Sequence, residues 1–219
     1  MKVGLLSDPH ANVLGLRAAL AAIRAAGAAE VICAGDAVGY HTSVNETIEE
    51  LRGSGAHVVL GNHDAMLLGK LAVSDELRAR YGLDHAARVI TAENLDWLGA
   101  LPESLELRLD GVAFAVYHGS PWAPLTEYVY PDDRELARFT MLDTDVVVLG
   151  HTHRPLHRQV GDVIVVNPGS CGLPRDEPTG APFAVLDTRT RAVTLARASY
   201  DEGAVEPSPF LEALRGAGR

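Results

Sequence analysis

Residues 2–10 have the sequence Lys-Val-Gly-Leu-Leu-Ser-Asp-Pro-His, and this stretch decides the fold. Lys2–Leu6 is a short apolar run typical of a buried strand, and polar residues follow it at once. The next segments repeat this arrangement, with helices predicted at 13–26 and 43–52 and strands at 30–33 and 57–60. In open α/β sheets the ligand crevice lies at the carboxyl ends of the strands, so we expect the polar residues after these strands to converge.

The second half of the chain changes to a series of strands. The patterns predict strands at 105–109, 112–117, 146–149, 156–160, 163–166, 183–186 and 193–196, with a helix at 132–142 among them. Asp-Gly and Gly-Asp turns favour hairpins between several of these strands. A parallel-leaning first half and a more antiparallel second half predict an α/β fold, a four-layer αββα sandwich of two mostly mixed β-sheets flanked by helices.

Length and composition favour one domain. The chain has 219 residues, of which 47% are hydrophobic and 22% charged, so we expect a single domain over residues 1–219. Residues 65–101 have a helical pattern that stops at Pro102, and they fit either a cap beside the crevice or a simple covering layer. The tail after about residue 201 contains Pro and Gly and is expected to be loosely ordered.

Charge and the N-terminal sequence limit the partners and the location. The formal net charge of −10 gives little support for binding a nucleic-acid backbone, which needs clustered Lys and Arg. The first apolar run is too short for a signal peptide or a membrane span, so we expect a cytoplasmic protein with no membrane partner. Cys33 and Cys171 are predicted to be unpaired thiols, with Cys33 in the core. A homo-oligomer is compatible with this composition.

Polar motifs follow the predicted strands at five places, namely Asp8-Pro9-His10, Gly35-Asp36, Gly61-Asn62-His63-Asp64, His118 and Gly150-His151-Thr152-His153. Each motif alone is compatible with an ordinary turn or helix cap. Asp8 and His10 are expected to project to one side of an extended segment, which Pro9 favours. Independent turns would rarely place so many metal-competent side chains just after strands. The candidate metal ligands are therefore Asp8, His10, Asp36, Asn62, His118, His151 and His153.

The types of these ligands indicate which ions they would bind. Imidazoles, carboxylates and an amide suit Mn, Fe, Ni, Co or Zn better than Mg or Ca, which prefer all-oxygen shells. Two such divalent ions would carry an excess of about two positive charges over two ligand carboxylates, enough to attract a phosphate to an acidic protein. Ions about 3.5–4 Å apart activate a shared water and polarise phosphoryl oxygens, so no side-chain nucleophile is required.

His63 and Asp64 are the candidate catalytic side chains. If Asn62 is a ligand, its extended neighbour His63 points the other way, where it can protonate the leaving oxygen or stabilise charge on the phosphoryl group. Asp64 is expected to orient His63 and to raise its pKa. His63 is thus the predicted general acid, and Asp64 is the residue predicted to orient it.

Three further residues are candidates for binding substrate. Arg175 could hold a phosphate oxygen beside an anion nest formed by the backbone amides of 169–172, for which a Gly-Pro turn that returns the chain is the structural alternative. Asn12 could touch substrate, although helix N-capping explains it as well. His41 follows Val38-Gly39-Tyr40, directly after the turn at Asp36, and is the third candidate.

The five motifs, in this order, resemble those of calcineurin-like metallophosphoesterases, over roughly residues 1–175. The resemblance implies one ion held by Asp8, His10 and His153, a second held by Asn62, His118 and His151, and Asp36 as the bridge. It implies the same roles for His63 and Asp64. Residues 7–16 and 166–175 are similar to the small bacterial and archaeal phosphodiesterase branch, which implies diester substrates, dinucleoside polyphosphates among them. Many relatives in that branch have Gly-Pro where this chain has His41-Thr42-Ser43, so the pocket wall is expected to differ.

The expected function is a dinuclear-metal-dependent phosphoesterase that hydrolyses a small phosphate ester, preferably a phosphodiester, with metal-activated water. One alternative is a metal-binding scaffold with the same fold and a decayed site, which the intact ligands and His63 oppose. Another is a nuclease, which would need a basic or aromatic groove. With 19 Lys and Arg against 29 Asp and Glu, such a groove is not apparent in the sequence. Residues 65–101 and 122–134 are expected to shape the pocket.

Overall fold

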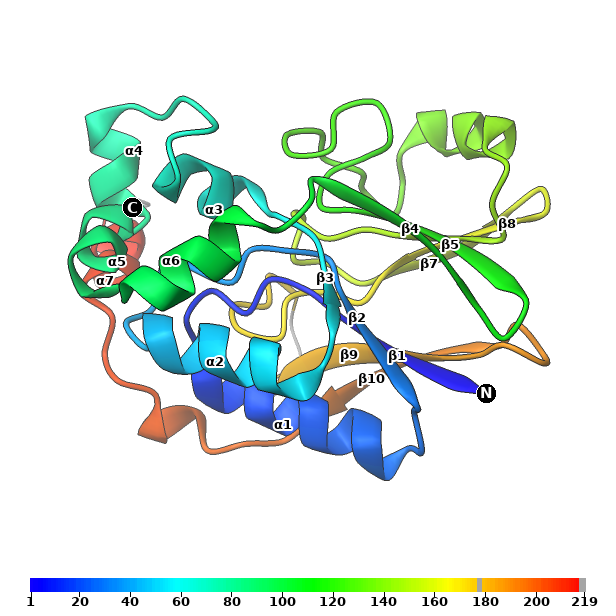
Figure 1. The fold of residues 1–219 in the computed structure, drawn as a ribbon, viewed down its shortest axis with the longest axis horizontal. Helices are drawn as coiled ribbons and strands as arrows, with labels where there is room; N and C mark the ends of the chain where they lie inside the picture. Colours follow the sequence, from blue (N-terminus) through cyan, green and yellow to red (C-terminus); the bar gives the residue numbers. More distant parts are fainter. Residues whose placement is uncertain (177–178, 217–219) are drawn as a thin grey trace.

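A computed structural model describes residues 1–176 and 179–216, and its strands form two five-stranded sheets that pack face to face (Figure 1). The first sheet has the order β10-β9-β1-β2-β3 and comprises β1 Lys2–Leu6, β2 Glu30–Cys33, β3 His57–Val58, β9 Ala181–Asp187 and β10 Val193–Ala198. The second has the order β4-β5-β6-β8-β7 and comprises β4 Ser104–Leu109, β5 Val112–Tyr117, β6 Val146–Val148, β7 Leu156–Val160 and β8 Val163–Asn167.

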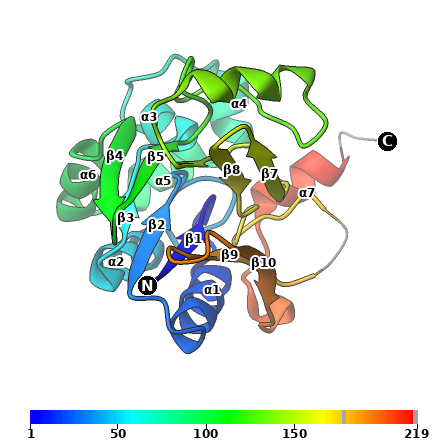
Figure 2. The ribbon, with the colours of Figure 1, turned by 90° about the vertical axis from the view of Figure 1, so that its right-hand side faces the viewer.

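Both sheets are mixed, as the sequence predicts. In the first sheet β1, β2 and β3 are parallel, whereas β9 and β10 are antiparallel to their neighbours. In the second sheet β5, β6 and β8 are parallel, and β4 and β7 run antiparallel at the two edges. The parallel strands at the centre of each sheet therefore direct their carboxyl ends to one edge of the sandwich, where loops from both sheets meet (Figure 1). Figure 2 views the sandwich from the opposite end and shows the second sheet above the first.

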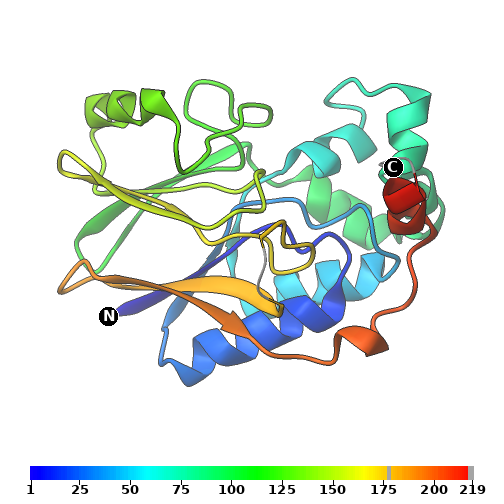
Figure 3. The same cartoon turned by 180° about the vertical axis from the view of Figure 1, so that it is seen from behind.

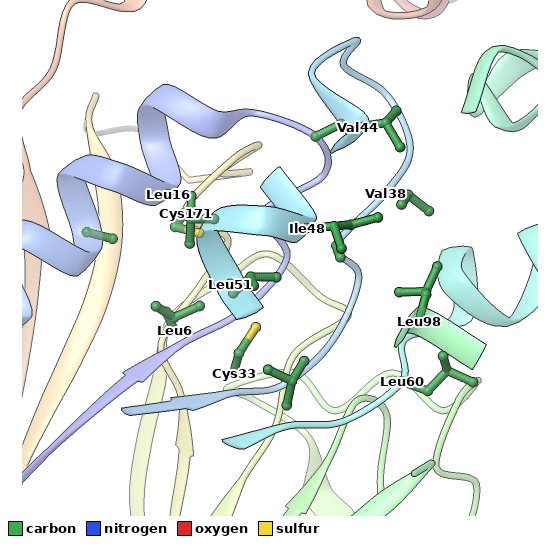
Figure 4. Packing of buried hydrophobic residues seen from close by; sticks show 14 of the residues in the cluster. Leu6, Leu16, Cys33, Val38, Val44, Ile48, Leu51, Leu60, Leu98 and Cys171 are labelled. Carbon is green, nitrogen blue, oxygen red and sulfur yellow. The ribbon is translucent and has the colours of Figure 1, made fainter. Parts of the chain in front are cut away.

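The alternation of side chains along β1 divides the interior into two apolar layers. Val3 and Leu5 point between the sheets and pack with Phe114 and Val146 of the second sheet. Leu6 points to the other face, toward α1 Val13–Ala25 and α2 Val44–Ser54. Figure 4 shows this layer, to which Cys33 and Cys171 both contribute as buried free thiols. The prediction that Cys33 belongs to the core is confirmed.

Helix α1 packs closely on β1 because residue 4 is glycine. A Cβ atom at Gly4 would overlap the side chain of Ile23, which lies on the buried face of α1. The helix begins after Asn12, whose side-chain oxygen accepts a hydrogen bond from the amide of Gly15 at 3.1 Å. These contacts fix the start of α1 directly beside the loop that leaves β1.

The outer layer over the second sheet differs from the prediction. The predicted helix at 132–142 is a 3-10 helix, η1, over Arg134–Met141. Phe139 is its one buried residue, and its ring packs against the second sheet with Val147 and Leu149. Leu136 and Leu142 pack partly buried beside it, so the segment covers the second sheet as predicted but in 3-10 turns.

The predicted helical segment 65–101 forms four short helices beside the strand ends, namely α3 Asn62–Leu67, α4 Asp75–Arg80, α5 Leu83–Val89 and α6 Ala92–Gly99. Gly69 and Gly82 have φ angles of 71°, a left-handed conformation that ends one helix before the next begins. The third strand is shorter than the predicted 57–60, because the amide of Leu60 donates to the carbonyl of Pro102 at 2.7 Å, outside the sheet.

The C-terminal tail passes under α1 and returns to the helices beside the strand ends (Figure 3). Residues 202–216, which the sequence predicts to be loosely ordered, contain the 3-10 turn η2 Glu202–Ala204 and the helix α7 Pro209–Gly216. The Ser208 hydroxyl donates to the carbonyl of Tyr40, and the ring of Phe210 lies 5.9 Å from that of His85. Each helix within the described residues is too short or too polar to cross a bilayer.

Candidate metal centre

The loops after the strands place most predicted ligands in an unusual backbone conformation. Positive φ angles are uncommon for residues other than glycine and cluster at functional sites. Five of the seven predicted ligands have them, at Asp8 (53°), His10 (47°), Asp36 (58°), His151 (67°) and His153 (57°). Asp8 and His10 are therefore not in the extended segment that the sequence predicts. The sharp turns bring their side chains together instead.

Asp8, His10 and His153 form the first cluster. The Nε2 atoms of His10 and His153 lie 3.0 Å apart, and Asp8 Oδ1 lies 3.7 Å from the first and 3.4 Å from the second. Metal–ligand bonds of about 2.0–2.2 Å place neighbouring donor atoms of one ion roughly 3 Å apart. The three side chains are almost completely buried and could hold one ion.

His118, Asn62 and His151 form the second cluster. His118 Nε2 lies 2.9 Å from Asn62 Oδ1, and the rings of His118 and His151 lie 4.9 Å apart. The Nε2 atom of His151 is buried and has no hydrogen-bond partner within the described residues. A buried polar atom without a partner is costly, so this nitrogen fits a ligand for an ion.

Asp36 joins the two clusters. Its Oδ2 atom lies 3.6 Å from His10 Nε2 and 3.3 Å from His118 Nε2. Its Oδ1 atom accepts a hydrogen bond from the backbone amide of His63 at 2.8 Å, which leaves Oδ2 directed at both clusters. A Cβ atom at Gly61 would overlap this carboxylate, so glycine is required at that position.

Backbone carbonyls determine which nitrogen of each ligand histidine faces the clusters. The Nδ1–H groups of His10, His118 and His153 donate to the carbonyls of Val38, Ala34 and Leu173 at 2.9, 2.7 and 2.6 Å. His151 makes the corresponding backbone hydrogen bond with Thr126. A neutral imidazole whose Nδ1 donates carries a free lone pair on Nε2, which is the form that binds metals.

The buried charges of the site also fit bound cations. Burial raises the pKa of Asp8 to about 7. Burial opposes protonation of His118, but the carboxylate of Asp36 outweighs it and raises the pKa of His118 to about 9. Burial would likewise raise the pKa of Asp36, but His118 and other imidazoles hold it well below its usual value. A protonated His118 thus supplies the positive charge beside these buried carboxylates. A bound divalent ion would supply that charge instead.

His10 and His153 show the opposite effect. Burial lowers the pKa of each well below the usual value. Both rings are therefore neutral at pH 7, and their Nε2 lone pairs face each other at 3.0 Å. Two facing lone pairs repel, and an ion between them would remove that repulsion.

His63 lies beside the clusters, but Asp64 does not orient it. The Asp64 carboxylate accepts hydrogen bonds from the backbone amides of Ala37, Val38 and Gly61, at 3.2, 3.1 and 3.0 Å. His63 Nδ1 is buried without a hydrogen-bond partner among the described residues, and burial lowers the pKa of His63 to about 4. The prediction that Asp64 orients His63 and raises its pKa is wrong, because three backbone amides use the carboxylate.

The rings of two tyrosines contact His63 instead. The centroid of Tyr81 lies 4.5 Å from that of His63, and the centroid of Tyr40 lies 4.9 Å from it. Asn62 and His63 begin helix α3, so the extended geometry assumed from the sequence is also incorrect. The conclusion that they point apart still holds, since Asn62 contacts His118 while His63 contacts the tyrosines.

The three substrate-binding candidates have different positions. Arg175 lines the cavity over the clusters, and its guanidinium lies 3.4 Å from the hydroxyl of Tyr40. Asn12 caps α1 and donates to the carbonyl of Gly172 at 2.9 Å, which is the structural alternative foreseen for it. His41 is buried outside the residues that line the cavity, and burial lowers its pKa to about 4. Of the three candidates, only Arg175 lines this cavity.

The segment 169–172 is a packed turn and not an anion nest. The amides of Cys171 and Gly172 donate to the carbonyls of Ser7 and Asp8 at 3.0 and 3.2 Å, and the amide of Gly169 donates to Asn167 Oδ1 at 2.9 Å. These donors are used within the fold. The turn instead holds the loop that carries Asp8 and His10 against the second half of the chain.

The cavity over the clusters has a volume of about 440 Å³ and includes residues that the motifs do not reveal. Arg80, Tyr81 and Tyr128 line it together with His63 and Arg175. They come from the two segments expected to shape the pocket, 65–101 and 122–134. No spacing in the sequence distinguishes them from other surface residues, because their helices and loops come together around one cavity only in the folded chain.

Known proteins share this fold and these motifs. A family model described as the calcineurin-like phosphoesterase superfamily domain matches residues 1–191. An uncharacterised protein of Methanocaldococcus jannaschii is 30% identical, over 91% of this chain and 88% of its own length. A phosphodiesterase of the same archaeon is 27% identical, over 87% of this chain and 95% of its own length.

A solved structure agrees with these relatives. The crystal structure of a metallophosphoesterase from Sphaerobacter thermophilus superposes with a TM-score of 0.79 at 29% identity, and covers all of this chain and 94% of that one. The two packed mixed sheets flanked by helices thus have the fold of a metallophosphoesterase. The chain belongs to the calcineurin-like phosphoesterase superfamily.

Proposed function

We propose that the chain hydrolyses a small phosphodiester with two divalent ions. The observation that carries this proposal is the position of Asp36, whose Oδ2 atom faces His10 in one cluster and His118 in the other. A carboxylate shared in this way is suited to two ions at the separation of about 3.5–4 Å that is found in two-metal hydrolases. Family membership supports a hydrolase, and the diester preference follows the relative that is named a phosphodiesterase.

The side chains would divide between the two ions as the clusters do. Asp8, His10 and His153 would hold one ion, and Asn62, His118 and His151 the other. The mixed nitrogen and oxygen donors favour Mn, Fe, Ni, Co or Zn. When bound, two such ions lower the pKa of a shared water and polarise the oxygens of a phosphoryl group.

The remaining residues of the cavity act on the substrate itself. Arg175 extends over the clusters, where its guanidinium can pair with a phosphoryl oxygen. His63 is neutral at pH 7, so it keeps one N–H group with which it can donate to the leaving oxygen or to the phosphoryl group. The rings of Tyr40 and Tyr81 hold His63 in the position from which it would do so.

The experiment that tests this proposal compares two model esters. Metal-stripped protein resupplied with Mn, Ni, Co, Zn or Mg is assayed with bis(p-nitrophenyl) phosphate and with p-nitrophenyl phosphate. We expect metal-dependent turnover with a higher kcat/KM for the diester. Asp36→Asn and His63→Ala should each reduce kcat by at least about 100-fold, the size usual for a lost group of the reacting site.

Matched controls separate chemistry from folding. Asp96→Asn and His57→Ala change the same residue types at exposed or half-exposed positions outside the cavity, and both should keep wild-type kcat. Bound metal without turnover of either ester would instead support a scaffold with this fold.

A further inference from the structure

We propose that a second subsite beside the metal centre binds a planar aromatic arm of the phosphodiester, such as a nucleoside, and that Tyr130 recognises this arm. The inference rests on the proposed function and names its substrate class. It starts from two adjoining cavities, the one over the clusters and a second of about 710 Å³. Arg175 lines both of them, so a molecule held by Arg175 at the metal centre can extend into the second cavity.

A row of rings leads from the metal centre to this second cavity. The ring of Tyr128 stacks on that of His151, with centroids 3.8 Å apart and an angle of 26°. The ring of Tyr130 is parallel to that of Tyr128, at 5.9 Å and 6°. Tyr128 lines the first cavity and Tyr130 the second, and their relative exposures are 47% and 40%. Exposed flat rings of this kind are suited to stacking with the bases of nucleic-acid components.

The second cavity also has the polar groups that such an arm needs. Arg154 and Arg175 both line it, and neither guanidinium forms an ion pair with an acidic side chain in the part of the chain that the structure describes. Asp176, beside Arg175, pairs with Arg197 instead. Pro131 and Pro155 add apolar walls. Among the described residues, the cavity therefore combines two arginines outside any ion pair and an aromatic surface with the carboxylates of Asp132 and Asp176, in a protein whose net charge is −10.

The two walls of the site indicate which arm lies there. His63 contacts Tyr40 and Tyr81, whereas His151 contacts Tyr128. A leaving oxygen that faces His63 directs the leaving group along the first wall. The arm that stays on the phosphate then follows the second wall, past Arg175 and onto Tyr130.

Two esters with the same leaving group test this subsite. Thymidine 5′-(p-nitrophenyl) phosphate and methyl p-nitrophenyl phosphate both release p-nitrophenolate and differ only in the retained arm. We expect kcat/KM to be about tenfold or more higher for the thymidine ester, the size of one stacking contact. Tyr130→Ala should lose this preference, while Tyr130→Phe keeps it. Similar kcat/KM values for both esters in the unmodified protein, or equal losses on both in Tyr130→Ala, would overturn the proposal.

A variant of the same loop controls for its folding. Trp122 is also exposed, but its ring packs on Phe139 and under Arg138 and lines neither cavity. Trp122→Ala should keep the preference for the thymidine ester. Loss of the preference in this variant as well would mean that loop order, and not Tyr130, produces it.

Binding gives a readout that does not depend on turnover. Calorimetry on the Mn-loaded protein should show adenosine 5′-monophosphate binding about tenfold or more tighter than methyl phosphate, a difference that Tyr130→Ala removes. If this difference is seen but no ester is hydrolysed, the subsite stands and the proposed function fails. If both esters are hydrolysed but the two phosphates bind equally, the function stands and the subsite is overturned.

Discussion

The Nε2 atoms of His10 and His153 face each other at 3.0 Å, while the Nδ1–H group of each ring donates a hydrogen bond to a backbone carbonyl. This relationship places two lone pairs in contact in a region with almost no exposure to water. The fold therefore holds the two rings in an arrangement that is unfavourable for the protein alone and favourable with an ion between them.

Metal removal should consequently lower stability. An ion present at about 100 times its dissociation constant stabilises the folded protein by about 2.7 kcal/mol, because the unfolded chain has no preformed site. For a chain of this length that corresponds to a fall in Tm of about 5–10 °C on chelation. Differential scanning fluorimetry before and after stripping, with Mn or Zn added back, measures it. His153→Ala should show a smaller shift, and an unchanged Tm in the unmodified protein would contradict a metal centre.

Asp64→Asn should destabilise the fold more than it changes the chemistry. The carboxylate accepts three backbone N–H groups, and the amide that replaces it turns one acceptor into a donor facing them. We expect a loss of about 2–4 kcal/mol in the free energy of unfolding, measured in urea, with Asp96→Asn as the neutral control. Full stability combined with loss of turnover would show instead that Asp64 acts through His63.

Gly61→Ala should damage the bridging position. The added methyl group would overlap both the carboxylate and the backbone amide of Asp36. We expect loss of at least about 2 kcal/mol of stability and a fall of about 100-fold or more in kcat, since the bridge must move. Gly53→Ala is the matched control, because it lies within α2 with open space around it and should stabilise the helix by about 1 kcal/mol.

Tyr81→Ala should separate positioning of His63 from substrate binding. The ring centroid of Tyr81 lies 4.5 Å from that of His63, and Tyr81 also lines the cavity, whereas its hydroxyl forms no hydrogen bond with that ring within the described residues. We expect Tyr81→Ala to lower kcat by about tenfold and Tyr81→Phe to keep it, as small displacements of a reacting group are costly. Steady-state kinetics with bis(p-nitrophenyl) phosphate decides, and a change confined to KM would assign Tyr81 to binding alone.

Asn12→Ala should affect folding and leave turnover intact. The side chain caps α1 and donates to the carbonyl of Gly172. Loss of the cap should cost about 1–2 kcal/mol in the free energy of unfolding, and Asn12→Ser should restore part of it. A large rise in KM at unchanged stability would contradict this assignment and show that Asn12 contacts the substrate.

The sequence by itself determined the alternation of strands and the ligands that follow them. Val3 and Leu5 alternate with residues of the opposite face, and polar motifs come directly after the apolar runs. Local periodicity and turn residues carry this information, since both depend on neighbours a few positions apart. That was sufficient to predict two mixed sheets, and the structure brings the seven candidate ligands together in two adjoining clusters joined at Asp36.

Only the tertiary structure decided how the side chains around those ligands are used. Asp64 follows His63 in sequence, but its carboxylate accepts hydrogen bonds from backbone amides 26 and 27 positions away. The rings that contact His63, those of Tyr81 and Tyr40, come from other segments. Likewise, the left-handed turns at Asp8 and His10 replace the extended geometry that Pro9 favours locally. Contacts between distant segments determine which backbone groups need a partner and where a cavity remains, and no local pattern records them.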